Sequence, residues 1–466
     1  MRSAALFCPV LRARFALLAL ILTLVIAPGC QRGPAPVDRA ALAEEVKTEF
    51  LHAWQGYKAH AWGHDELLPL SAGYRDWHSV SLLMTPVDAY DTMLLMGLTA
   101  EAAEAKKLIL DSLDFDHAIT VKNFEITIRT LGGLLSAYQL DGDPRFLALA
   151  QELGDRLLPV FNSPTGMPYT FVNLKTGAVS GPVSNPAEIG TLLLEFGTLS
   201  KLTGQKRYYN KAKIALVQLF NRRSDLGLVG TTINVETGEW GDTSSHISGM
   251  IDSYYEYLFK SWKLFGDGDC KLMFDSSMVA VNRYLADEVE GCLWYGRADM
   301  NSGARGLRLF GSLDAFMPGL LIYAGDRSRA EKLQDSCYRL WMLHGIEPEM
   351  LDYGKMEVTA ANYELRPENI ESAWYLHRFT GEDKYLAMGR DYFVSLRTHC
   401  RTEHGYAALA SVITKEKKDS QESFFLTETL KYLYLLFAPV EIDLDQTVFN
   451  TEAHPLKRTW PPDPVY

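Results

Sequence analysis

LLSAYQLDGDPRFLALA, residues 134–150, combines an apolar helical stretch, a turn at Gly142 and the beginning of a second helix. Apolar residues at helical spacing on both sides of a glycine turn predict a pair of helices. A weaker copy surrounds Gly325, and clear copies occur at residues 196–212 (FGTLSKLTGQKRYYNKA), 257–273 (YLFKSWKLFGDGDCKLM) and 374–389 (WYLHRFTGEDKYLAMG). We therefore expect a fold built from repeated helix pairs.

The turn glycines recur about every 60 residues, which fits a helix pair followed by a long loop. They are Gly142, Gly204, Gly266, Gly325 and Gly381. Six or seven such pairs can form an open superhelix or a closed ring, and periodicity alone does not distinguish the two. Closure is favoured because the loops mix aromatic residues with carboxylates, as expected if they meet at one mouth. Residues 166–172 and 229–235 predict short strands within those loops.

The composition restricts the class of partner. The chain has 466 residues, of which 47% are hydrophobic, so it can bury a large core. Its formal net charge is −12, and no stripe of lysines and arginines appears. Because binding to phosphates needs clustered basic residues, the sequence argues against a nucleic-acid partner. An acidic chain suits a neutral substrate or a cation.

The N-terminus predicts export. Three arginines within residues 1–14 precede an apolar run at 15–27, which is short for a membrane span. Residues 27–30 loosely match a bacterial lipobox, in which Cys30 would carry a lipid. Cleaved soluble export and an uncleaved anchor are the alternatives. We expect an exported lipoprotein that faces the periplasm or outer membrane and contacts the membrane only through this anchor.

The remaining chain predicts one domain. Residues 31–38 form a short tether with two prolines, and residues 39–466 contain no low-complexity linker. We expect a monomer. Four cysteines follow the signal and lack zinc-type spacing. Buried apolar residues are the simplest interpretation, although a disulfide bridge or two remains an alternative; these cysteines are Cys270, Cys292, Cys337 and Cys400.

Acidic residues lie in apolar, helical surroundings in five segments. Each has an ordinary explanation: an ion pair of Glu125 with Arg129 on a helix surface, or an acid in the first turn of a helix. Five such segments in one anionic chain instead favour a buried acidic centre, because buried carboxylates need protons, partners or a cation. Two acids separated by a sugar and a water would suit inverting glycoside hydrolysis. The other segments contain Glu188, Asp252, Glu368 and the pair Glu422 and Glu428.

Residues 448–455 (VFNTEAHP) give a different signal. Thr451 has a carbonyl and a hydroxyl oxygen, and calcium prefers several oxygen ligands, including waters. An ordinary turn is the alternative. No EF-hand loop is present in the sequence.

These segments resemble, in order, the blocks of the family 47 glycoside hydrolases, the class I α-1,2-mannosidases, and their ER degradation-enhancing relatives. The resemblance covers residues 53–455. Its blocks are 53–71 (AWQGYKAHAWGHDELLPLS), 87–93 (VDAYDTM), 124–138 (FEITIRTLGGLLSAY), 252–260 (DSYYEYLFK), 365–372 (LRPENIES), 422–437 (ESFFLTETLKYLYLLF) and 449–455 (FNTEAHP).

The resemblance implies an all-α (α/α)7 barrel with short β-hairpins in the loops and Ca²⁺ at the bottom of a central pocket. It implies that Glu125 is the acid, acting through a water, that Glu368 is the base, and that Asp252 is a third catalytic carboxylate, either acid or helper. Thr451 would give calcium two oxygens, and the 2- and 3-hydroxyls of the bound mannose would complete the shell. The implied residues that bind α-mannoside glycans or hold the calcium waters are Arg129, Glu188, Arg366, Phe424, Glu428 and Glu452.

The chain departs from the processing mannosidases at residues 312–319 (SLDAFMPG), where those enzymes have a histidine and a cysteine before Leu-Pro-Gly. This stretch and residues 222–230 resemble the degradation-enhancing branch. Cys337 matches half of a disulfide whose partner position here is Ala315, so that bridge should be absent. The sequence thus predicts an inverting exo-α-1,2-mannosidase. The alternatives are a protein that binds mannose glycans with little hydrolysis and a different helical-barrel enzyme.

Overall fold

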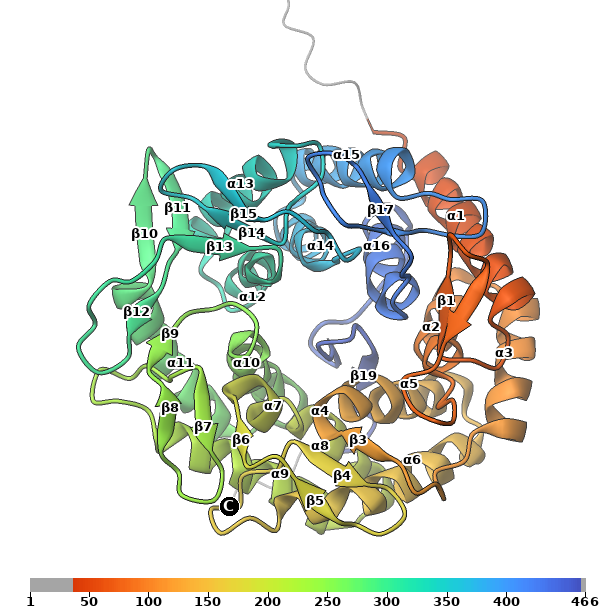
Figure 1. The fold of residues 1–466 in the computed structure, drawn as a ribbon, viewed down its shortest axis with the longest axis horizontal. Coiled ribbons are helices and arrows are strands. Elements are labelled where there is room, and N and C mark those ends of the chain that lie inside the picture. The colour runs from red at the N-terminus through yellow and green to blue at the C-terminus, as the bar shows by residue number, and fades with distance from the viewer. Residues whose placement is uncertain (1–36, 462–466) are drawn as a thin grey trace, which may run out of the picture. The chain divides into compact units, whose positions relative to one another are not determined.

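A computed structural model describes residues 37–461 of the chain. The predicted signal at residues 1–30 and the tether up to residue 36 lie outside the described residues. Figure 1 shows the helices of residues 37–461 in two concentric rings. The paired helices are α1 (Arg39–His60) with α16 (Leu430–Phe437), α2 (Met84–Met96) with α3 (Thr99–Ser112), α5 (Gly132–Asp141) with α6 (Pro144–Leu157), α8 (Leu193–Thr203) with α9 (Lys206–Phe220), α10 (Asp252–Phe265) with α11 (Gly268–Tyr284), α12 (Met317–Tyr323) with α13 (Arg327–Met342), and α14 (Glu368–Thr380) with α15 (Asp383–His399).

Burial separates the two rings. The inner helix α10 is buried on nearly every side, whereas in the outer helix α3 only Ala102, Ala105 and Ile109 are buried. Helices that are apolar all round belong to a core, and helices with one apolar stripe cover it. The ring closes where α1 packs on α16 and where the segment before α16 packs on α2. The prediction of an all-α (α/α)7 barrel is confirmed.

The chain also contains short helices beside the paired ones. Two of them are π-helical and two are 3-10 helices. They are α4 (Asn123–Ile126), the π-helix η1 (Thr127–Leu131), the 3-10 helix η2 (Leu158–Phe161), α7 (Pro186–Gly190), the 3-10 helix η3 (Leu313–Phe316) and the π-helix η4 (Phe425–Thr429).

Glycine turns connect inner to outer helices, as the repeat predicts. All five predicted glycines have positive φ, between 70° and 93°. A left-handed residue ends a helix by satisfying its last carbonyls, and glycine adopts this conformation without penalty. Gly97, with φ of 70°, does the same between α2 and α3. The sequence pattern missed this sixth turn because its surroundings, LLMGLTA, lack the polar turn residues of the other copies.

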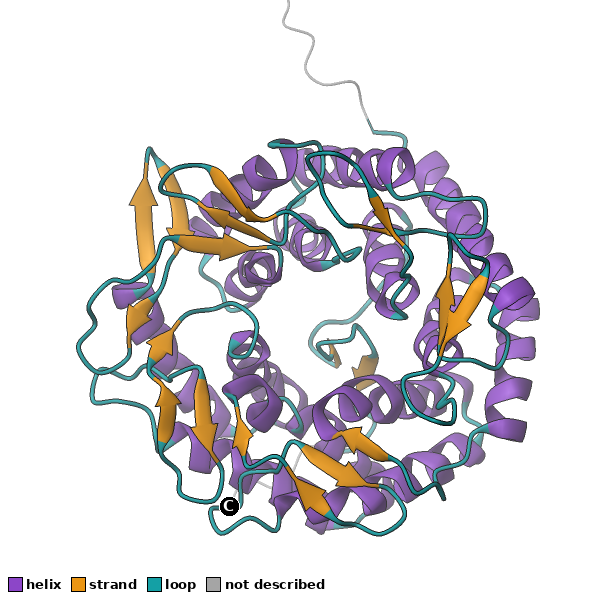
Figure 2. Cartoon of the chain, in the orientation of Figure 1, coloured by secondary structure: helices purple, strands orange, loops and turns teal. Residues whose placement is uncertain are grey.

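The strands form small antiparallel sheets that gather on one face of the ring, as Figure 2 shows in orange. β4 overlaps the predicted extended segment at 166–172 and β7 falls within the one at 229–235, whereas the other strands lie outside both segments. The strands are β1 (Glu66–Leu68), β2 (Gly73–Arg75), β3 (Thr120–Lys122), β4 (Phe171–Asn173), β5 (Val179–Ser180), β6 (Val183–Ser184), β7 (Thr232–Asn234), β8 (Trp240–Asp242), β9 (Ser244–Ser245), β10 (Ala286–Val289), β11 (Cys292–Tyr295), β12 (Ala298–Asp299), β13 (Leu309–Gly311), β14 (Met350–Asp352), β15 (Glu357–Ala360), β16 (Ala408–Leu409), β17 (Lys417–Lys418), β18 (Thr447–Phe449) and β19 (Pro455–Lys457).

One hairpin lies inside the ring rather than on its face. Strands β18 and β19 pair from Thr447 with Lys457 to Phe449 with Pro455, and Figure 1 shows them within the inner ring. Phe449 is fully buried against the edge of Trp374, with ring centroids 5.4 Å apart. The hairpin therefore carries residues 450–454 into the centre of the barrel.

All four cysteines of the described chain are free. Cys270, Cys337 and Cys400 are buried and Cys292 is half-buried, which agrees with the interpretation as apolar residues and with the expected absence of a bridge to Cys337. Across residues 37–461, no helix has the length and apolar content needed to cross a membrane.

Candidate active site

The ten site residues expected from the sequence line one cavity of about 260 Å³ at the centre of the inner ring. The cavity brings together residues from α4, α7, α10, α14, both π-helices and the β18–β19 turn. The shared residues are Glu125, Arg129, Glu188, Asp252, Arg366, Glu368, Phe424, Glu428, Thr451 and Glu452. The structure places them together, and the role of each stays a prediction.

The carboxylates occupy the first turns of inner helices. Asp252 and Glu368 are the first residues of α10 and α14, and Glu188 is the third of α7. Backbone N–H groups and the helix dipole favour a negative charge at this end. These acids are therefore both first-turn helix residues and members of one acidic centre, because the helix N-termini converge on the cavity.

Both π-helices contribute a cavity residue. Arg129 lies in η1 and Glu428 in η4. A π-helix inserts an extra residue into a turn, shifts the facing of side chains and is frequent at functional sites. The Glu125 and Arg129 pair is real, with Nη2 3.2 Å from Oε2, but it faces the cavity instead of the helix surface.

Two arginines organise the acids around Phe424. Arg129 pairs with Glu125 and Glu452, and the guanidinium of Arg366 pairs with Glu349, 2.7 Å from Nη2 to Oε1. Both guanidinium groups lie over the Phe424 ring at 5.7 Å from its centroid. Such contacts fix planar side chains in a desolvated site.

Backbone strain flanks the cavity residues. Met250 (φ 79°), Leu365 (φ 64°) and Ala453 (φ 54°) are left-handed, although none is glycine. They lie two residues before Asp252, directly before Arg366 and directly after Glu452. Such strain costs about 1–3 kcal/mol per residue and is concentrated at functional sites, where the surrounding structure enforces it.

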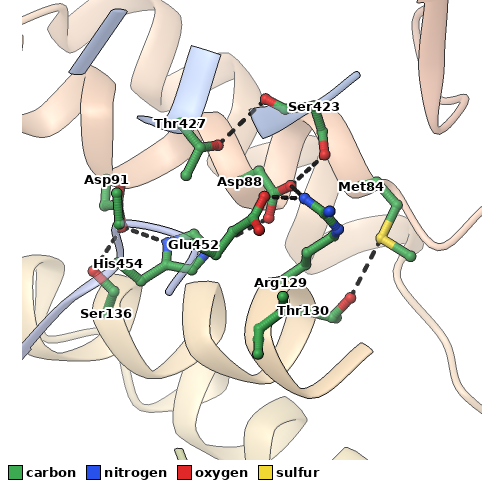
Figure 3. A network of polar contacts seen from close by, with 12 residues as sticks. Met84, Asp88, Asp91, Arg129, Thr130, Ser136, Ser423, Thr427, Glu452 and His454 are labelled. Atoms are coloured by element: carbon green, nitrogen blue, oxygen red, sulfur yellow. Dashed lines mark hydrogen bonds and ion pairs between the residues drawn. The ribbon is translucent and has the colours of Figure 1, made fainter. Parts of the chain in front are cut away.

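A buried polar network fixes the turn between β18 and β19 (Figure 3). His454 contacts Asp91 at 2.7 Å and Asp88 at 3.3 Å, and Asp88 also accepts a hydrogen bond from Ser423. Lys431 pairs with Asp91 at 2.6 Å. The turn that presents Thr451 and Glu452 is thus held by α16, which is near it in the sequence, and by α2, whose Asp91 is 363 positions from His454.

Burial changes the acidity of the catalytic candidates. It raises the pKa of Asp252 to about 7 and that of Glu368 to about 8, although Arg366 favours the ionised form of Glu368. The pKa of Glu428 is also raised well above its usual range, first by burial and then by the charge of Glu452. Glu368 Oε2 is buried without a hydrogen-bond partner. Crowded carboxylates with an unpartnered oxygen favour a positively charged ligand.

The donor chemistry fits calcium. Thr451 lines the same cavity as the carboxylates of Glu368, Glu428 and Glu452, and hard cations prefer oxygen ligands and waters. Among residues 37–461, no three His, Cys, Asp or Glu side chains come together as ligands of one ion.

Sequence reasoning missed several functional candidates. Asp88 and Asp91 lie within the quoted block VDAYDTM, but nothing in their spacing connects them to His454. Glu256 and Lys260 follow Asp252 at four-residue steps, a spacing that places them on one helix face. They form a buried ion pair, and a smaller cavity of about 50 Å³ lies between Glu256 and Asp252. Lys122 and Asn185 also line the main cavity.

The departing segment at residues 312–319 lies beside the site. Leu313 lines the cavity, and Ser312 Oγ lies 3.1 Å from Oε2 of Glu349, the partner of Arg366. The departing segment therefore contacts the carboxylate that pairs with a cavity arginine.

Comparisons with known proteins agree with this geometry. The sequence model of Glycosyl hydrolase family 47 matches residues 49–458. The human protein named ER degradation-enhancing alpha-mannosidase-like protein 2 is 38% identical and covers 92% of this chain and 79% of its own. The human mannosyl-oligosaccharide 1,2-alpha-mannosidase IB is 37% identical, and the match covers 91% of this chain and 71% of that protein. The structure of an alpha-1,2-mannosidase from Trichoderma reesei matches with TM-score 0.84 at 28% identity, over 91% of this chain and 100% of its own. Overall identity does not separate the two kinds of human relative.

Proposed function

The chain belongs to glycosyl hydrolase family 47, and from this premise we propose that it is an inverting exo-α-1,2-mannosidase that removes terminal mannose from oligomannosides or N-glycans. The observation that carries the proposal is the convergence of Glu125, Asp252 and Glu368 on one cavity. Inverting hydrolysis needs an acid at the leaving oxygen and a base that activates water on the opposite side of the sugar. The family membership argues against an unrelated helical-barrel enzyme.

Each carboxylate has a role in the proposed reaction. Glu368 takes a proton from a water as its oxygen attacks the anomeric carbon. Glu125 delivers a proton, through a second water, to the oxygen of the departing sugar as the glycosidic bond breaks. Asp252, whose pKa burial raises to about 7, assists on the acid side. Arg129 and Phe424 hold the ring, since both lie at the cavity wall.

Calcium is the proposed cofactor. Thr451 would hold it directly, and Glu368, Glu428 and Glu452 would hold its waters. When bound, it would supply a fixed positive charge for two vicinal hydroxyls of mannose, which favours a distorted ring. The protein groups named above then act on a sugar that is already oriented.

Time-resolved NMR on α-1,2-mannobiose tests the proposal. We expect β-mannose as the first product and loss of the rate with a chelator, restored by Ca²⁺. Retention of configuration would contradict the mechanism. The Ser312 departure favours a second candidate, a protein that binds mannose glycans with little turnover. That candidate predicts a measurable affinity for mannobiose together with a wild-type turnover near zero.

Export is a separate part of the proposal. The pattern at residues 1–30 supports a lipid on Cys30 and an enzyme that acts on glycans outside the cytoplasm. That the enzyme is a monomer is part of the same proposal. In a bacterial host, Cys30→Ser should move the protein from the membrane fraction to the soluble fraction. Membrane association unchanged by this substitution would contradict the lipid anchor.

A further inference from the structure

Lys122 connects two site carboxylates from different inner helices. It is the last residue of β3, where it pairs with Phe171 of β4. Its Nζ lies 2.9 Å from Glu188 Oε1 and 3.8 Å from Glu125 Oε1. The ammonium thus lies between the proposed acid on α4 and an acid on α7, and it lines the cavity.

The depth of the cavity residues places Lys122 near the mouth. The side chain of Lys122 is 38% exposed and that of Glu125 is 23% exposed, whereas that of Glu452 is 3% exposed. Thr451 and Glu368 line the main cavity and also the smaller cavity that adjoins it. Lys122 lines only the main one. The cavity therefore has a deep end at Glu452, the neighbour of Thr451 in the chain, and a shallow end at Lys122.

At least one N–H donor of the Lys122 ammonium is not used by the neighbouring carboxylates. The ammonium has three N–H donors and no acceptor, and its two neighbouring carboxylates occupy at most two of them in the paired geometry. The pKa of Lys122 is raised: burial lowers it, but the charges of Glu188 and Glu125 outweigh that effect. The group is therefore a permanent cation that can donate to a sugar hydroxyl.

We propose that Lys122 binds the departing sugar, one residue beyond the mannose that is released. This inference rests on the proposed function: an exo-enzyme that holds the terminal mannose at the deep end leaves the next sugar beside Lys122. A hydroxyl oxygen of that sugar accepts a hydrogen bond from Nζ. The contact would place the leaving oxygen within reach of Glu125.

The test separates the two sugar positions. Kd is measured by calorimetry, with calcium present, for two probes: an uncleavable thio-linked α-1,2-mannobiose and the single-ring mimic 1-deoxymannojirimycin. We expect Lys122→Met to raise the Kd of the disaccharide on the order of tenfold or more, because a charged hydrogen bond is lost. The single-ring mimic should keep its Kd within about twofold. Lys122→Arg, which keeps the charge, should restore part of the disaccharide affinity.

Lys175→Met is the matched control, because Lys175 is an exposed lysine that pairs with Asp116 at 3.3 Å and does not line the cavity. Lys122→Met with unchanged Kd for both probes would overturn the inference, and would leave Lys122 as an ion-pair link between helices. An equal rise in Kd for both probes would also overturn the inference. Failure of the proposed function is distinct: the wild-type protein would then release no mannose from mannobiose.

Discussion

His454 Nδ1 lies 2.7 Å from Asp91 Oδ2, and the two residues are 363 positions apart in the chain. Both side chains are fully buried, and Lys431 completes the cluster. This contact ties the turn that carries Thr451 and Glu452 to the inner helix α2. Removing one partner would leave an uncompensated charge in the core, which is strongly destabilising.

The His454 cluster predicts a pH-dependent stability. Burial opposes the charge of His454, but Asp91 and Asp88 outweigh it and raise its pKa to about 9 from the usual 6.5. A raised pKa contributes stability that is complete below pH 6.5 and is lost as the pH rises towards 9. We expect the free energy of unfolding to fall by about 3 kcal/mol at most over this window. Denaturant titrations at pH 6, 7.5 and 9 measure it.

His454→Gln is the control for this effect, because glutamine keeps a hydrogen-bonding side chain but has no group that gains or loses a proton in this pH range. The variant should be less stable at pH 6 and should lose most of the slope between pH 6.5 and 9. The same slope in the variant would show that another group is responsible. On the acid side, Lys431 and His454 hold the pKa of Asp91 at about 2, so its contribution is lost only as the pH falls from about 4 towards 2.

The sequence predicted the helix pairs because each pair is local: a periodic apolar face and a glycine turn lie within about 20 residues of each other. The acids of the site could also be predicted, because a carboxylate at the start of an apolar helix is costly to bury without a proton, a partner or a cation. The position of the β18–β19 hairpin was not predictable from residues alone. It depends on the closure of the whole ring, and the contacts that hold it, such as His454 with Asp91, join residues 363 positions apart. The residues alone left Thr451 as either a calcium ligand or part of an ordinary turn, and only the family resemblance favoured the ligand.

Substitution of the proposed base and acid should separate their roles. Glu368→Gln and Glu125→Gln are both expected to lower kcat on α-1,2-mannobiose by about 10²- to 10⁴-fold, because each removes a proton-transfer group. With α-mannosyl fluoride, whose leaving group needs no proton, Glu125→Gln should recover most of its rate and Glu368→Gln should not. Initial rates from fluoride release measure this difference.

Asp252→Asn decides whether Asp252 shares the acid role. Recovery on the fluoride in this variant would place Asp252 on the leaving-group side, as proposed. If Glu125→Gln stayed inactive on the fluoride, Glu125 would not be the acid. Thermal unfolding of all three variants shows that the fold is retained.

Calcium removal should lower both activity and stability. A ligand that binds only the folded state stabilises it by about 2.7 kcal/mol at a concentration 100 times its Kd. We expect EDTA to lower Tm and abolish turnover, and added Ca²⁺ to restore both. Thr451→Ala should keep the Tm of the EDTA-treated protein and lose most of the calcium-induced increase. A calcium response unchanged in Thr451→Ala would exclude this residue as the ligand.

Two glycines on either side of one turn test the origin of the helix-pair repeat. Gly266 ends α10 with φ of 73°, and Gly268 begins α11 with negative φ. An added Cβ would meet no atom within 4 Å at either position, so neither substitution causes a clash with neighbouring residues. Gly266→Ala should destabilise the protein by about 1 kcal/mol, because only the left-handed backbone penalises the side chain. Gly268→Ala should stabilise it by about 0.4–1 kcal/mol, since alanine reduces the entropy of the unfolded chain. Denaturation midpoints of the two variants compare these effects, and equal effects of the same sign would contradict a conformational role for the turn glycine.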